Sequence, residues 1–282
     1  MTSATHQART VQLGMVGGHL ACLAALETGV SAAALLVASV AYVLRAFGVT
    51  AGFHRLLAHG SFRTGRTTQF VLALLGSLAT QGGPLWWVSH HRNHHRYSDS
   101  PQDLHSPRQR GFWYSHMGWM WDKASFERPA TNVKELYRFP ELKALQRYYP
   151  LLILGQGLAF YGLGAFLGSY FPDTGTTGSQ MLVWGFIIST VALWHATFMV
   201  NSVCHVWGKR AYETGDVSTN NPLVALLTLG EGWHNNHHKF GYSARHGLEW
   251  WQIDLTYLSL RGLEVLGLVG ELKLPRKVPA PA

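Results

Sequence analysis

Four long apolar stretches interrupt an otherwise mixed sequence, and they fall into two pairs. The first pair covers residues 11–28 and 31–50, and the second covers residues 150–171 and 180–200. Each stretch is close to the roughly 17–25 residues that an α-helix needs to cross the hydrocarbon core of a membrane. Because a short polar turn joins the members of each pair, the pattern predicts two transmembrane helical hairpins. A buried hairpin in a soluble protein is the alternative for the first pair.

The segments outside these stretches, residues 51–149 and 201–282, contain shorter apolar runs. Residues 69–79 form a run that is too short to span a membrane, which predicts an interfacial or buried helix. Residues 255–269 include charged positions and predict an amphipathic helix. We therefore predict an all-α integral membrane protein with a single domain over residues 1–282, in which four transmembrane helices carry a helical cap.

The basic residues predict how this domain is oriented. All 23 Lys and Arg lie in the N-terminal tail, between residues 45 and 147, or after residue 201, whereas the two hairpin turns carry the acidic residues Glu27 and Asp173. Cytoplasmic segments of membrane proteins are enriched in Lys and Arg. Both termini and the cap are thus expected to face the cytoplasm, and the expected location is a bacterial inner membrane that the chain crosses several times.

The charge of the chain also bears on its partners. Charged residues make up 13% of the sequence and the net charge is +8. The basic residues are scattered, whereas a nucleic-acid-binding protein would cluster them among aromatic residues. We therefore expect contact with anionic lipid headgroups or with an acidic partner, and not with nucleic acid.

Histidines provide the candidate chemistry, and three groups of them fall in the predicted cap. Two groups repeat the spacing i, i+3, i+4, which places their imidazoles on one face of a helix. The third is a pair five residues apart, which does not align on an ideal α-helix, and we expect Gly60 to end the helix and let the second histidine turn inward. The three groups are His91, His94 and His95; His234, His237 and His238; and His54 and His59.

These eight imidazoles are too many for a single ion such as zinc, which takes about four ligands, so the spacing predicts two metal ions. Imidazole binds zinc, copper, iron and nickel, and the ligand type leaves that choice open. The membrane setting favours a long acyl chain as substrate. Reaction at its unactivated C–H bonds requires a metal that activates oxygen, for which iron is the usual choice.

Four motifs, read together, resemble the membrane-bound fatty-acid desaturases, in particular the Δ9 acyl-CoA and acyl-lipid branch that includes stearoyl-CoA desaturase-like enzymes. They occur in the family order between about residues 11 and 274. Leu104 stands where the family often has proline. The motifs are GVTAGFHRLLAHGSF at 48–62, HRNHHRYSDSPQDLHSPRQRGFWYSHMGW at 91–119, ATFMVNSVCHVWG at 196–208 and GEGWHNNHHKF at 230–240.

The resemblance implies a di-iron centre whose protein ligands are all histidines, with O2 as co-substrate. It adds His205 as a ninth ligand and Asn201 as a residue that holds a metal through water. The implied ligands are His54, His59, His91, His94, His95, His205, His234, His237 and His238.

Other site residues follow from position in the sequence. Carboxylates close to the histidine groups can accept hydrogen bonds from the far nitrogens of ligand imidazoles, which makes Asp99, Asp103 and Glu231 candidates for this role. A surface charge is the alternative for each of them. Tyr42 and Trp194 project from predicted spans and are candidates to limit the depth of a substrate tunnel, with simple packing as the alternative.

The family reaction is the O2-dependent formation of a cis double bond in a saturated acyl chain carried by CoA or by a lipid. The chain contains no HPGG haem motif, no cysteine quartet and no GxGxxG motif. Its electrons are therefore expected from a separate ferredoxin, rubredoxin or cytochrome b5-like protein with a reductase. A related membrane hydroxylase or decarboxylase and a histidine-rich membrane zinc protein are the alternatives, and the tail after the second motif favours desaturation.

Overall fold

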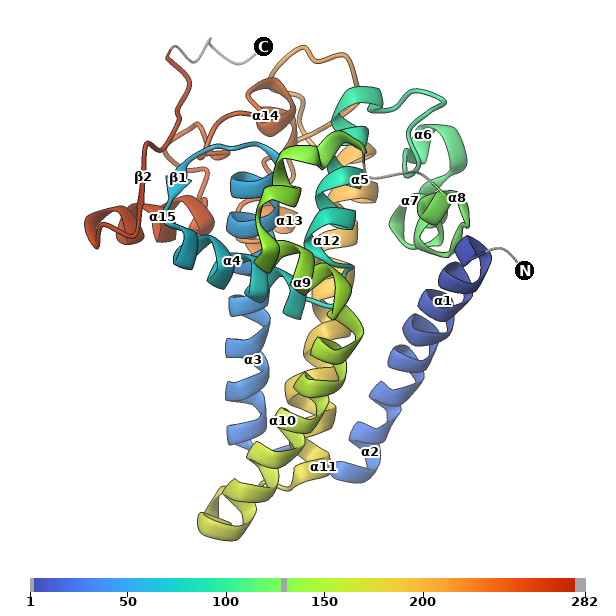
Figure 1. Cartoon of the computed structure of the whole chain (residues 1–282), viewed down its shortest axis with the longest axis vertical. Helices are drawn as coiled ribbons and strands as arrows, with labels where there is room; N and C mark the ends of the chain where they lie inside the picture. The colour runs from blue at the N-terminus through green and yellow to red at the C-terminus, as the bar shows by residue number, and fades with distance from the viewer. Residues whose placement is uncertain (1–2, 128–130, 277–282) are drawn as a thin grey trace.

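The computed structural model describes residues 3–127 and 131–276, and they form long helices that carry a cap of shorter ones (Figure 1). The first half of the chain comprises α1 (Ser3–Ala21), η1 (Cys22–Ala24), α2 (Ala25–Thr28), α3 (Ala32–Phe47), η2 (Gly48–Ala58), β1 (Arg63–Thr64), α4 (Arg66–Leu78), α5 (Pro84–Tyr97), α6 (Pro107–Arg110), α7 (Phe112–His116), η3 (Gly118–Trp121), α8 (Ala124–Glu127), η4 (Thr131–Arg138) and α9 (Pro140–Arg147). The second half comprises α10 (Tyr149–Tyr170), η5 (Pro172–Thr174), α11 (Gly178–Met181), η6 (Leu182–Ile188), α12 (Ser189–Ser202), η7 (Val203–His205), α13 (Pro222–Leu227), α14 (His234–Lys239), α15 (Leu255–Val265) and β2 (Val269–Gly270).

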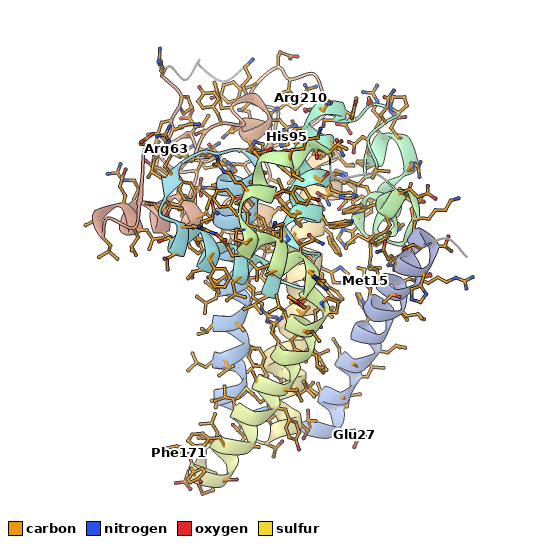
Figure 2. All side chains as sticks on the ribbon, in the orientation of Figure 1. Met15, Glu27, Arg63, His95, Phe171 and Arg210 are labelled. Atoms are coloured by element: carbon orange, nitrogen blue, oxygen red, sulfur yellow. The ribbon has the colours of Figure 1, made fainter. Side chains whose placement is uncertain are left out.

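Three continuous helical stretches are long and apolar enough to cross a membrane: Ala32–Ala58, Tyr149–Tyr170 and Gly178–His205. Two of them begin at polar caps, because the hydroxyl of Ser31 accepts a hydrogen bond from the amide of Ala34 and α11 is capped in the same way. Many large apolar side chains on their outer faces are exposed, as expected of helices surrounded by lipid. Figure 2 shows His95 in the cap, far from Phe171 at the other end of these helices.

The first predicted span does not meet the same test. Residues 11–28 lie in α1, η1 and α2, and these helices are not among the three stretches. The physical reason is composition, because Gln12, His19 and Glu27 interrupt the apolar residues of this segment. Three of the four predicted spans therefore have counterparts with sufficient length and apolar character.

The second predicted span is longer than expected, because the helix continues as the π-helix η2 to Ala58 and so enters the cap. Two glycines allow this segment to lie against α4. A methyl group on Gly48 would come within 2.2 Å of the amide nitrogen of Gly76, and one on Gly52 within 2.5 Å of the carbonyl of Leu72. A side chain at either glycine would force α4 away from η2.

A buried arginine joins α3 to the stretch that contains η6 and α12. Arg45 is 3% exposed, and its guanidinium donates hydrogen bonds to the hydroxyls of Ser189 and Thr190 and to the carbonyls of Ala41 and Gly185. A charge that is buried in an apolar bundle without hydrogen-bond partners is energetically costly. The four neutral acceptors provide such partners for the guanidinium of Arg45.

The cap is held to the end of η2 by its own core and by a short sheet. Phe53 and Leu57 of η2 pack with Val88 of α5 and Leu142 of α9. The sheet pairs β1 with β2 in antiparallel register, with Arg63 opposite Gly270. It therefore ties the C-terminal segment to the chain that follows η2. The predicted short helix over residues 69–79 forms α4, and the predicted amphipathic helix forms α15.

Candidate metal centre

The structure brings the nine predicted histidines together in two groups, each with ligand nitrogens within 4.8 Å of one another. Group A contains His54, His59, His91, His95 and His237. Group B contains His94, His205, His234 and His238. The members come from η2 and the residue after its end, α5, η7 and α14, so four separate segments of the chain meet here.

Each HxxHH sequence contributes to both groups. On α5, the i, i+4 pair His91 and His95 belongs to group A, whereas His94 belongs to group B. On α14 the assignment is reversed, because the i, i+4 pair belongs to group B and His237 belongs to group A. Residues four apart differ in direction by about 40° around the helix axis, whereas residues three apart differ by about 60° in the opposite sense. Each helix therefore bridges the two positions.

A π-helix explains how two histidines five residues apart reach the same group. The amide of His59 donates to the carbonyl of His54 at 3.1 Å, which is the i to i+5 bond of a π-helix. The two rings stand 4.9 Å apart between centroids. Gly60 adopts a positive φ of 56° directly after the end of the helix, as expected of the residue that ends it. The π-helix itself also aligns the pair.

The structure places His205 at the end of the stretch that contains α12. Its Nε2 lies 3.0 Å from Nε2 of His234. Asn201 lies one turn earlier and is half-buried. The backbone carbonyl of Asn201 accepts a hydrogen bond from the hydroxyl of Ser115 at 3.0 Å.

Four histidines have a carboxylate at the nitrogen that faces away from the groups. Three of these carboxylates are the predicted ones: Glu231 lies 2.5 Å from Nδ1 of His54, Asp103 lies 3.0 Å from Nδ1 of His94, and Asp99 lies 2.9 Å from Nδ1 of His205. In a neutral imidazole, such a contact places the proton on Nδ1 and leaves the lone pair of Nε2 free.

The fourth carboxylate was not predicted. Asp216 lies 2.6 Å from Nδ1 of His238 and is held by the hydroxyl and amide of Ser218. It lies in the loop between η7 and α13, with no histidine close to it in the sequence. A search for carboxylates adjacent to the histidine motifs therefore could not have found it.

A buried cluster of charged residues contacts group A through Glu231, the partner of His54. The guanidinium of Arg55 is fully buried and contacts Glu231 at 3.0 Å and Asp254 at 3.0 Å, and it also donates to the carbonyl of Ala244 at 2.7 Å. His246 lies in the same cluster, with its Nδ1 3.4 Å from Glu231. This cluster connects η2, which carries His54, to the segment that follows α14.

Electrostatics keep most of the imidazoles neutral. Burial and then the neighbouring histidines place the pKa well below the usual value for His59, His91, His95, His234 and His237. A neutral imidazole has the lone pair that a metal requires. Burial opposes a charge on His94 as well, but the carboxylate of Asp103 outweighs it and raises the pKa of His94. The carboxylate of Asp103 therefore stabilises a positive charge on the imidazole of His94.

The nitrogen atoms fit two metal ions. In group A, Nε2 of His59 lies 2.7 Å from Nε2 of His91, and Nε2 of His237 lies 3.0 Å and 2.8 Å from those of His54 and His95. Two nitrogens that each bind a metal at about 2.1 Å, at right angles, are about 3 Å apart. In group B, the buried Nε2 atoms of His94 and His238 have no hydrogen-bond partner among the described residues. A shared cation would satisfy these lone pairs.

Each of the two predicted tunnel residues forms a hydrogen bond with a backbone carbonyl. The hydroxyl of Tyr42 donates to the carbonyl of Leu227 at 2.6 Å. The indole of Trp194 donates to the carbonyl of Thr80 at 2.9 Å, and its ring packs in a cluster with Met15 and Phe198. Both aromatic side chains are thus fixed in place by a hydrogen bond.

Replacing Asp216 with asparagine tests the role of the unpredicted carboxylate. We expect the metal affinity of group B to fall by about 10–100-fold, the usual cost of losing an outer partner of a ligand histidine, while group A keeps its metal. Chelator competition with metal analysis measures both. Asp122→Asn removes a carboxylate that pairs with Arg110 at 3.0 Å near the surface and serves as the control. Equal affinities in the two variants would contradict the assignment.

Comparison with known proteins points to one family. The sequence model described as fatty acid desaturase matches residues 31–263. The icosanoyl-CoA 5-desaturase of Limnanthes douglasii is 45% identical over 232 residues, which cover 81% of this chain and 61% of that protein. The palmitoyl-monogalactosyldiacylglycerol delta-7 desaturase of Arabidopsis thaliana is 44% identical over 81% of this chain and 58% of its own length. The sn-1 stearoyl-lipid 9-desaturase of Anabaena variabilis is 41% identical over 94% of this chain and 93% of its own length.

The chain spans about 60% of the length of the first three curated relatives that it matches, and nearly the full length of the cyanobacterial one. The names of these relatives include positions 5, 7 and 9 for the double bond. The shared feature of the names is therefore the desaturation of an acyl chain attached to CoA or to a lipid.

Proposed function

The chain belongs to the fatty acid desaturase family, and on this premise we propose that it is an O2-dependent acyl desaturase that introduces a cis double bond, at the Δ9 position, into a saturated acyl chain attached to CoA or to a lipid. The observation that carries this proposal is the arrangement of nine histidines in a group of five and a group of four. The relative that matches over nearly its whole length is named as a 9-desaturase, which supports the position of the double bond.

Each group would hold one iron ion through its Nε2 atoms. When bound, iron supplies the activation of O2 and the oxidant that removes hydrogen from the acyl chain. The protein contributes neutral imidazoles, and the carboxylates that face His54, His94, His205 and His238 hold the tautomer that exposes Nε2. Group B has one histidine fewer than group A, and Asn201 would complete it through a water molecule.

The substrate chain would enter between the long helices, so that its polar end remains at the cap. The depth of its site would be limited by Tyr42 and Trp194, whose rings are held by hydrogen bonds to the carbonyls of Leu227 and Thr80. Fixed aromatic side chains suit this role because regioselectivity requires that one carbon stop at a defined distance from the oxidant.

The membrane arrangement follows from the same proposal. The helices α1 and α2 run from the cap to the turn region near α11, alongside the three candidate spans (Figure 1), and we assign them as the fourth span. The cap and both groups would then face the cytoplasm, on the side with the basic residues.

Fatty-acid profiling in a host without its own desaturase tests the proposed function. We expect a new monounsaturated acid with a cis Δ9 bond, located by mass spectrometry after derivatisation. The His237→Ala variant is the control for host background and should produce no new acid. A hydroxy acid or a terminal alkene, with no new internal double bond, would instead favour a hydroxylase or decarboxylase. Zinc retention with no oxygen consumption would favour a metal-binding protein without this activity.

A further inference from the structure

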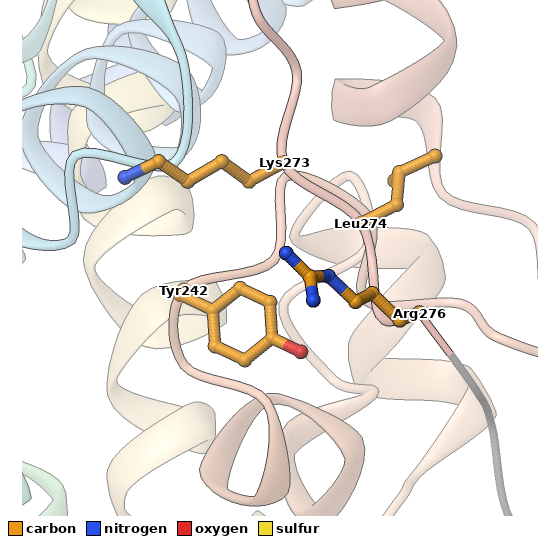
Figure 3. Close-up of a pocket in the computed structure, with 4 residues that line it drawn as sticks. All are labelled: Tyr242, Lys273, Leu274 and Arg276. Atoms are coloured by element: carbon orange, nitrogen blue, oxygen red, sulfur yellow. The ribbon is translucent and has the colours of Figure 1, made fainter.

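A hollow of about 450 Å³ opens on the surface of the cap, lined by Tyr242, Lys273, Leu274 and Arg276. Figure 3 shows that its two sides come from different segments, with Tyr242 on the chain after α14 and the other three residues on the C-terminal segment. The two sides are tied together, since the amide of Ala244 donates to the carbonyl of Lys273 at 2.8 Å. The hollow is therefore formed by segments in a fixed relative position.

Both sides of the hollow contact the segment that carries His59. A methyl group built on Gly241, the residue before Tyr242, would lie 3.6 Å from Cε1 and Nδ1 of His59. The amide of Lys273 donates to the carbonyl of Ser61 at 2.9 Å, two residues after His59. His59 belongs to group A and is half-buried. Gly241 and the imidazole of His59 thus connect the hollow to group A.

The charge of the hollow is positive. Lys273 and Arg276 are exposed, and within residues 3–127 and 131–276 neither forms an ion pair. The nearby carboxylate of Glu271 is already paired with Arg63 at 3.1 Å. Tyr242 is 47% exposed. Tyrosine and arginine are the residue types that contribute most of the energy at protein–protein contacts, so this surface suits an acidic protein.

The position of the hollow argues against lipid headgroups as its occupant. Figure 1 shows α14 and the C-terminal segment at the end of the molecule farthest from the turn between α10 and α11. Figure 1 shows α15 nearer to the long helices than α14 is, and α15 exposes apolar side chains, among them Leu258 and Val265. An interfacial helix of this kind places the headgroup layer at its own level, and the hollow lies beyond it.

We propose that this hollow is the docking site of a small acidic protein that carries one electron at a time, and that its electrons enter group A by way of His59. The inference rests on the proposed function, because desaturation consumes electrons. One CH2–CH2 unit, one O2, two protons and two electrons give one CH=CH unit and two water molecules. With two cysteines, this chain cannot build an iron–sulfur cluster on four thiolates, so the two electrons come from a carrier.

The test is a charge reversal with a matched control. The double variant Lys273→Glu/Arg276→Glu reverses the hollow, and Lys134→Glu/Lys143→Glu makes the same change in net charge at exposed positions of η4 and α9. The probe is a reduced acidic [2Fe–2S] ferredoxin, titrated against iron-loaded protein in nanodiscs of neutral lipid. We expect Kd to rise by at least about tenfold for the hollow variant at low salt and to stay unchanged for the control. The difference should vanish near 0.5 M salt, where screening is strong.

Turnover with dithionite and a mediator separates this inference from the proposed function. We expect that activity to be equal in the parent and both variants, because the chemical reductant does not need the hollow. Ferredoxin binding that is equal in the two variants, or absent in the parent, overturns the docking site. Ferredoxin binding that depends on Lys273 and Arg276, together with no desaturation by dithionite in the parent, keeps the docking site and rejects desaturation as the function.

Discussion

Replacing His237 with alanine is expected to abolish desaturation and to remove one metal ion from the protein. His237 Nε2 contacts two other imidazole nitrogens of group A, at 3.0 Å and 2.8 Å, so its loss removes the nitrogen shared by both contacts. We expect activity to fall by more than the 10–100-fold that is typical for an outer partner of a metal ligand. The metal content should fall from two ions per chain towards one, because group B keeps its four histidines. Elemental analysis and oxygen-consumption assays measure the two effects.

The matching change in group B is His94→Ala, and the control is His90→Ala. His90 lies on the same helix, α5, one residue before His91, but belongs to neither group. Its Nδ1 contacts the carbonyl of Trp86 at 2.9 Å. We expect the control to keep two metal ions, whereas His94→Ala keeps the one in group A. Loss of metal from the control, or full metal content and turnover in either ligand variant, would contradict the assignment of the groups.

The members of the two histidine groups were predictable from the sequence, eight from their spacing and His205 only from the family resemblance, but their division between the groups was not. The spacing i, i+3, i+4 is a local property of a helix, and it is enough to identify α5 and α14 as helices that carry ligands. Which imidazole joins which group depends on how the two helices face each other. His94 lies in the group of the α14 pair, and His237 lies in the group of the α5 pair. That exchange is a result of tertiary packing and has no local signal.

Two other features that the sequence did not predict also result from tertiary packing. The pair His54 and His59 is aligned by a π-helix whose path against α4 depends on Gly48 and Gly52, and neither glycine reveals its packing partner in the sequence. Asp216 reaches His238 from a loop 22 positions away in the sequence. Local pattern therefore identifies most of the proposed ligands, whereas the partners that orient them depend on contacts between distant segments.

The first predicted span shows how tertiary contacts change the limits of an apolar helix. Residues 11–28 are apolar enough to suggest a span, but the helix that contains them already includes Ser3 in the polar tail. Its buried residues Ala4, Ala8 and Met15 face the cap and the neighbouring helices. Contacts with the rest of the protein thus extend this helix beyond the apolar stretch.

Replacing Arg55 with methionine is expected to destabilise the whole protein strongly, because this is its most deeply buried ion-paired arginine among the described residues. The guanidinium is 0% exposed and lies between Glu231 and Asp254, at 3.0 Å from each. Removing it leaves two buried carboxylates without their cation, and breaking a buried ion pair in this way costs about 3–5 kcal/mol. Glu231 also contacts Nδ1 of His54, so group A should lose affinity for its metal together with the loss of stability.

Thermal unfolding in detergent, followed by the loss of the monodisperse peak, measures this effect. For a chain of this size we expect the midpoint to fall by about 10 °C, at about 2–4 °C per kcal/mol. The control is Arg66→Met, whose pair with Glu141 at 2.8 Å is exposed and therefore contributes little to stability. The double variant Arg55→Met/Asp254→Asn should recover part of the loss, because it removes one of the two stranded charges. A midpoint for Arg55→Met equal to that of the control would show that the carboxylates do not depend on this cation, and would place the support of His54 elsewhere in the cap.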